Sequence, residues 1–122
     1  MFGKYMVAHL LGHTRDNEVN FRRVERKLTK QGFICFSPVI YNLSEYLKYQ
    51  DLIDDMCYEK LLVCDLCVAV TLGESTNIRI SQAKKLNIPS FTFNIHMNRL
   101  IPYDDMAKNS DVYVKYLESL NK

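Results

Sequence analysis

Short hydrophobic runs alternate along this chain with stretches whose apolar residues recur at helical spacing. The apolar runs are too short to form helices of their own and predict buried β-strands, because nearly continuous apolar runs of this length are typical of parallel sheets. They lie at residues 5–11, 33–36 and 66–71, and residues 89–93 are predicted as a fourth strand. Segments whose apolar residues stand three or four positions apart predict amphipathic helices. They lie within residues 17–32, 51–61, 78–86 and 111–120.

The alternation of strands and helices defines the expected fold. Parallel strands need crossover connections, which are right-handed, and a chain of 122 residues forms one domain, residues 1–122. We therefore predict an α/β fold, a flavodoxin/Rossmann-like three-layer sandwich with a four- to five-stranded parallel sheet in the order 2-1-3-4. Residues 39–46 and 94–105 follow neither pattern and are expected to be irregular.

The strand order also predicts where a ligand binds. In an open parallel sheet the crevice lies outside the carboxyl ends of the strands where their order reverses, which here is between the first and third strands. The loops after these two strands must face each other, and the loop that begins at Ser37 can lean over them. The predicted ligand-binding residues in these loops are Gly12, His13, Ser37, Gly73, Ser75, Thr76 and Asn77.

Three polar residues, Ser75, Thr76 and Asn77, stand at the predicted start of the third helix. Unpaired backbone N–H groups and the positive end of the helix dipole make such a position an anion site, to which the hydroxyls add donors. The other interpretation is that one of the three simply caps the helix. The segment contains neither GxxxxGKS/T nor GxGxxG, so no known phosphate-binding motif decides between the two.

Charge and cysteine content narrow the class of protein. A net charge of +2 makes no electrostatic case for nucleic acid or an anionic membrane, and no apolar run approaches the ~18 residues of a membrane span. We expect a cytoplasmic protein with reduced cysteines. Cys64 and Cys67 form a CxxC without the second pair that a zinc site of this kind needs, so we expect core packing. We predict no metal and no cofactor.

Several pieces of sequence occur in a characteristic order and spacing. They are YMVA at 5–8, FSP at 36–38, LLVCD at 61–65, Ser75, and AKKLNIP at 83–89. Together they resemble the nucleoside 2-deoxyribosyltransferase-like superfamily, with the nearest likeness to its small, often phage-borne branches. The resemblance covers about residues 4–93. It implies a small-molecule nucleoside or nucleotide ligand and a homodimer or higher homo-oligomer.

The chain departs from this superfamily at the positions that perform its chemistry. In active members a glutamate on the third helix attacks the sugar, an aspartate on the second helix assists, and a tyrosine at the end of the first strand positions them. The matching positions here are Arg79, Cys57 and Tyr5. A guanidinium stays protonated and cannot act as a carboxylate nucleophile. Helix periodicity places Cys57 beside an apolar stripe. Burial there is expected to keep the thiol protonated, which makes it a poor substitute for the aspartate.

Three functions therefore remain open. The first is a nucleoside- or nucleotide-binding domain without the standard glycosyl transfer, in which Arg79 either holds a phosphate or carboxylate or is a surface residue. The second is an active N-glycosidase or deoxyribosyltransferase that uses displaced carboxylates. The third is a protein-interaction factor, which would use the aromatic residues of segment 41–49. The catalytic residues stay unassigned, with the candidates Glu74, Asp54, Tyr5 and Cys57.

Overall fold

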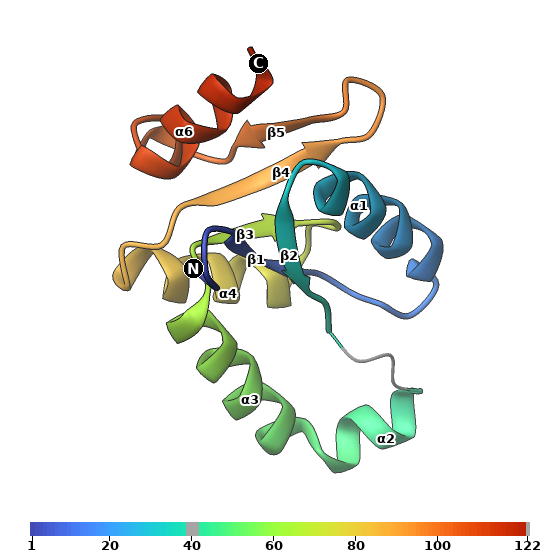
Figure 1. The fold of residues 1–122 in the computed structure, drawn as a ribbon. Helices are drawn as coiled ribbons and strands as arrows, with labels where there is room; N and C mark the ends of the chain where they lie inside the picture. The colour runs from blue at the N-terminus through green and yellow to red at the C-terminus, as the bar shows by residue number, and fades with distance from the viewer. Residues whose placement is uncertain (39–41, 122) are drawn as a thin grey trace.

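The computed structural model describes residues 1–38 and 42–121, and these contain a five-stranded sheet (Figure 1). The strands are β1 (Met6–Leu11), β2 (Phe33–Phe36), β3 (Leu66–Ala69), β4 (Ser90–Asn94) and β5 (Arg99–Pro102). Their order is β2-β1-β3-β4-β5, which confirms the predicted order of the first four. Those four strands are parallel, and β5 is added at the edge antiparallel to β4.

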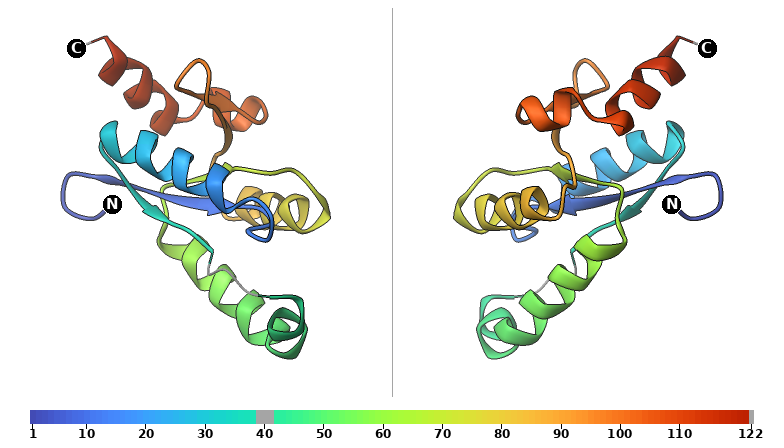
Figure 2. Two further views of the ribbon diagram at one scale, coloured as in Figure 1. Left: turned by 90° about the vertical axis from the view of Figure 1, so that its right-hand side faces the viewer. Right: turned by 90° about the vertical axis from the view of Figure 1, so that its left-hand side faces the viewer.

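Helices cover both faces of the sheet, which confirms the predicted α/β architecture. They are α1 (Glu18–Lys30), α2 (Leu43–Lys48), α3 (Gln50–Val63), α4 (Glu74–Lys85), α5 (Asp105–Lys108) and α6 (Asp111–Leu120). Figure 2 shows α1 and α6 on one side of the sheet and α3 on the other. Among the described helices, none combines the length and the apolar character that crossing a membrane requires.

Two hydrophobic clusters, one on each face, hold the three layers together. Successive side chains of a strand point to opposite faces, so Ala8 and Leu10 of β1 join one cluster while Val7 and Leu11 join the other. The first cluster receives side chains from α1 and α6, and the second from α3 and α4. The helical contributors include Phe21, Val24, Leu28 and Tyr116 in the first, and Leu61, Ile80 and Ala83 in the second.

The expectation that residues 94–105 are irregular is wrong. Residues 99–102 form β5, and α5 begins at Asp105. Within β5 only Leu100 is buried, so no apolar run marks the strand in the sequence. The strand exists because its backbone pairs with β4 across a turn in which Asn98 adopts a left-handed conformation, with φ of +54°.

The segment before α3 also differs from expectation, in the part that the structure describes. α2 begins after Asn42, whose side-chain oxygen accepts a hydrogen bond from the Glu45 N–H at 2.9 Å. The Glu45 carboxylate accepts one from the Asn42 N–H at 3.3 Å, which completes a capping box. Positions 39–41 of the expected loop lie outside the described residues. In Figure 1, α2 and the start of α3 stand clear of the sheet.

Candidate functional site

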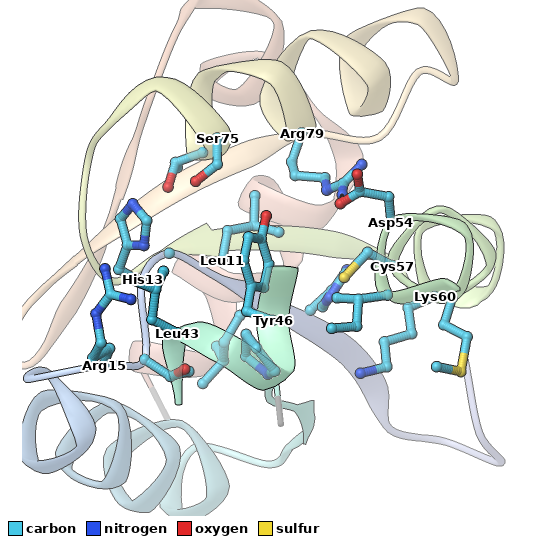
Figure 3. A pocket seen from close by; sticks show the side chains of 18 of the residues that line it. Leu11, His13, Arg15, Leu43, Tyr46, Asp54, Cys57, Lys60, Ser75 and Arg79 are labelled. Atoms are coloured by element: carbon cyan, nitrogen blue, oxygen red, sulfur yellow. Dashed lines mark hydrogen bonds and ion pairs between the residues drawn. The ribbon is translucent and has the colours of Figure 1, made fainter. Parts of the chain in front are cut away.

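A pocket with a volume of about 490 Å³ opens at the carboxyl ends of β1 and β3, the edge at which the strand order predicts a crevice (Figure 3). The end of β1 forms its floor, and the loop after β1 borders it. The first part of α4 forms one wall, and α2 with α3 forms the opposite wall. The lining residues with polar or reactive groups include His9, His13, Thr14, Arg15, Tyr46, Asp54, Cys57, Lys60, Ser75, Thr76 and Arg79.

The loops after β1 and β3 are joined through Thr71. Its side-chain oxygen accepts a hydrogen bond from the His13 N–H at 2.9 Å, and its carbonyl accepts one from the Thr76 hydroxyl at 3.0 Å. Gly12 has φ of +134°, and a Cβ added there would lie 2.3 Å from the Thr71 hydroxyl oxygen. Gly12 and His13 could be predicted from the sequence, whereas Thr71 could not, because it looks like the last member of an apolar run.

The start of α4 faces the pocket with its first turn. The N-cap residue is Gly73, and no side chain caps the helix, so the interpretation of Ser75, Thr76 or Asn77 as the cap is wrong. Ser75 and Thr76 line the pocket, but the Thr76 hydroxyl is already engaged by the Thr71 carbonyl. Asn77 is turned away, because its side-chain oxygen accepts a hydrogen bond from the Tyr103 hydroxyl at 3.5 Å. Ser75 thus remains as the hydroxyl group available here.

Arg79 joins the two walls of the pocket. Its Nη2 lies 2.5 Å from the Asp54 carboxylate on α3, and its Nη1 donates to the Gln82 side-chain oxygen at 3.0 Å. The Arg79 side chain is only 16% exposed, so the alternative that it is a solvent-facing surface residue is wrong. Figure 3 shows Arg79 and Asp54 pointing toward each other above Cys57, which also lines the pocket.

The described lining is predominantly positive. Arg15, Lys60 and Arg79 contribute three cations, against the single carboxylate of Asp54. Burial, followed by the charges of Lys60 and Arg79, lowers the pKa of the His9 imidazole to about 4. The ring is therefore neutral at neutral pH and adds no charge to the floor. Such a pocket attracts an anionic small molecule.

The described lining holds no pair of carboxylates. Glu74, the first residue of α4, is exposed and does not line the pocket. Asp54 lines it but is bound to Arg79. The two acidic groups that the resemblance associates with glycosyl transfer thus have no counterpart facing each other across this cleft.

Some residues expected at the site lie elsewhere. Tyr5 precedes β1 at its amino end, opposite the edge where the pocket opens, and it is absent from the described lining. The structure does not bring Tyr5 to this pocket, because a residue that begins a strand lies a strand length from the residue that ends it. The Ser37 hydroxyl donates to Glu25, and the neighbouring Pro38 lines the pocket in its place. Gly73 positions α4 but does not itself line the pocket.

Comparisons with known proteins bear on the fold. No family model matches the chain, and no curated protein matches it. The solved structure of the CMP N-glycosidase BcmB from Clostridium botulinum matches 93% of this chain and 81% of its own, with a TM-score of 0.53 and 12% identity. At this identity the likeness is one of fold. The chain shares its α/β architecture with this structure, in agreement with the α/β fold that the sequence predicts.

Proposed function

We propose that this domain binds a nucleoside monophosphate or a related anionic nucleotide-type ligand and does not perform the standard glycosyl transfer. The observation that carries the proposal is the pocket itself, with three cations and a single, already paired carboxylate in its described lining. Its volume of about 490 Å³ falls within the range of small-molecule sites. The fold shared with a protein named as a CMP N-glycosidase points to the same class of ligand.

The parts of the pocket suit different parts of such a ligand. Arg15 and the first turn of α4, with the Ser75 hydroxyl, provide donors for a phosphate group. Leu43, Tyr46 and Leu47 of α2 provide an apolar and aromatic wall against which a base can stack. Figure 3 shows Ser75 on one side of the pocket and Leu43 and Tyr46 on the other, with Arg15 at the edge beside Leu43.

The chemistry of Arg79 argues against glycosyl transfer by the standard route. That reaction needs a free carboxylate to attack the anomeric carbon and an acid to protonate the leaving base. Arg79 cannot provide a carboxylate, and its contact with Asp54 occupies the acidic side chain that the described lining contains. The proposed function is therefore recognition of the intact ligand.

An active N-glycosidase remains the second candidate because the Asp54 carboxylate lines the pocket and its side chain is 43% exposed. In that case Asp54 would leave Arg79 and act on the ligand. The two functions make opposite predictions for the Asp54→Asn variant, in which the side chain keeps its shape and loses its charge.

The test is calorimetric titration with CMP, dCMP, cytidine and ADP-ribose, combined with chromatography for released base. For a binding domain we expect CMP to bind at least tenfold more tightly than cytidine. Asp54→Asn should raise CMP affinity by about fivefold, because one negative charge near the ligand is worth about 1 kcal/mol at a partly exposed site. For an N-glycosidase, wild-type protein would release cytosine and Asp54→Asn would not.

A matched pair of arginine variants controls for a general charge effect. Arg15→Gln removes a cation from the pocket, while Arg23→Gln removes one from a separate basic depression on α1. We expect about a tenfold loss of CMP affinity in the first and little change in the second. The proposed function would be contradicted if none of the four ligands bound, or if both variants lost CMP affinity equally.

A further inference from the structure

Three side chains that can bind a soft metal ion meet beneath the pocket floor. His9 lies on β1 directly opposite Cys67 on β3 in the strand register. Cys64 follows α3 as its C-cap residue and lies three residues before Cys67, so the CxxC spans the passage from helix to strand. In parallel strands, paired residues point to the same face, which brings the His9 ring and the Cys67 thiol together on the face covered by α3 and α4.

The cluster is enclosed by protein. His9, Cys64 and Cys67 are 1%, 9% and 0% exposed, and their ligand atoms all lie within 4.8 Å of one another. The His9 Nδ1 atom is buried without a hydrogen-bond partner among the described residues. A buried polar atom without a partner is unfavourable and needs an explanation. A ligand held at this position would provide one.

We propose that His9, Cys64 and Cys67 form a buried binding site for a zinc ion. Two thiolates and an imidazole are the ligand types that zinc prefers, and a tetrahedral zinc ion holds such atoms about 3.5–3.8 Å apart. Small side-chain movements therefore suffice to close the observed cluster around an ion. The three protein ligands leave a fourth coordination position for water or another exogenous ligand.

The sequence alone argues against zinc, because the CxxC has no second pair of cysteines. The structure provides the third ligand from another part of the chain, since β1 and β3 are neighbours in the sheet although His9 and Cys67 are far apart in sequence. On binding, Cys64 and Cys67 each release one proton to solvent and act as thiolates, and His9 binds through a neutral ring nitrogen. His9 also lines the pocket, so an ion here would fix its ring in the floor.

The experiment uses the full chain, reduced and stripped of metal by a chelator, and titrates it with Co²⁺ as a spectroscopic substitute for Zn²⁺. We expect one equivalent of Co²⁺ to produce a near-ultraviolet thiolate charge-transfer band and the visible bands of tetrahedral coordination. Added Zn²⁺ should bleach both bands by displacement. Zinc should also raise the midpoint of thermal unfolding, because it binds the folded state.

Cysteine variants distinguish this cluster from the other thiols. Cys64→Ala should abolish the charge-transfer band, whereas Cys57→Ala, which removes a thiol that lines the ligand pocket, should retain it. Should Cys64→Ala unfold, His9→Gln provides a second test, because loss of one ligand should weaken Co²⁺ binding at least tenfold. Absence of the band in wild-type protein, an unchanged band in folded Cys64→Ala, or uptake of Cu⁺ but not Zn²⁺ would overturn the proposal. None of these readouts depends on the nucleotide ligand.

Discussion

Gly12 shows how closely the two loops of the pocket approach each other. Its φ of +134° lies in a region that residues with a side chain rarely adopt, and a Cβ would meet the Thr71 hydroxyl oxygen at 2.3 Å. Because Thr71 is also bonded to His13 and Thr76, it cannot move without disturbing both loops. Position 12 therefore requires a residue without a Cβ atom, which is glycine.

We expect Gly12→Ala to lower the free energy of unfolding by at least ~2 kcal/mol, because steric overlap adds to backbone strain. Gly32→Ala is the matched control, since Gly32 has φ of +91° but no atom within 4 Å of an added Cβ. Strain alone should lower its stability by about 1 kcal/mol. Urea unfolding followed by circular dichroism measures both. Equal losses in the two variants would show that the Thr71 contact does not matter.

The thiol of Cys35 makes the free energy of unfolding depend on pH in the alkaline range. Burial, and then the nearby Glu25 carboxylate, raises the pKa of its thiol to about 11 from the usual 9.0. Between these values the unfolded chain has lost the proton that the folded protein keeps. The folded state therefore binds more protons, and stability falls as pH rises through this window.

Because Cys35 is only partly buried, screening reduces this contribution to about 1 kcal/mol. We expect Cys35→Ala to be less stable than wild type at pH about 8 and to lose about 1 kcal/mol less than wild type between pH about 9 and about 11. Urea unfolding at several pH values measures the difference, and groups that titrate in both proteins cancel. Parallel stability curves would show that the folded and unfolded thiols titrate alike.

At the scale of elements, α3 is attached to the sheet mainly by its last turns. Leu61 is fully buried in the cluster under the sheet, while Leu52 and Met56 nearer the start are 56% and 44% exposed. The contact between Arg79 and Asp54 adds a polar link from α4 to the middle of α3. A wall of the pocket therefore depends on an anchor at one end and an ion pair farther along.

This arrangement predicts a large difference between two neighbouring leucines. Leu61→Ala should lower the free energy of unfolding by about 3 kcal/mol, because it leaves a cavity at the anchor. Leu62 is 50% exposed, so Leu62→Ala should change it by less than ~0.5 kcal/mol. Chemical denaturation of both variants provides the comparison. Similar values would mean that α3 is held in some other way.

At the scale of the whole molecule, the pocket is assembled from parts that are distant in sequence. The floor comes from β1, one wall from α2 and α3, and the other from α4. The parallel order of β2, β1 and β3 brings these parts to one edge of the sheet. The same neighbouring strands that shape the pocket bring His9 to Cys67 beneath it. Both proposed sites therefore follow from one crossover in the topology.

The sequence predicted the helices and strands that have a hydrophobic pattern of their own. It did not predict elements and contacts that depend on other parts of the chain. β1, β2 and β3 are visible because each is a nearly continuous apolar run, and β1 and β3 are buried on both faces. β5 was not predicted, because one of its faces is exposed and only Leu100 is buried. The loop residues Gly12 and Ser75 could be placed from strand order alone. Asp54 was named as a displaced carboxylate, but its bond to Arg79 depends on the angle between α3 and α4, which periodicity does not encode.

By itself, the sequence determined the α/β class, the order of the parallel strands and the edge of the sheet at which a pocket opens. Hydrophobic periodicity is a property of local chain segments, and the handedness of crossovers follows a general rule that needs no knowledge of individual contacts. Tertiary structure alone decided which side chains meet there. It paired Arg79 with Asp54, turned Asn77 away, placed Tyr5 at the opposite edge and brought His9 to the two cysteines. Such contacts depend on packing across the layers, where a shift of one helical turn changes every partner.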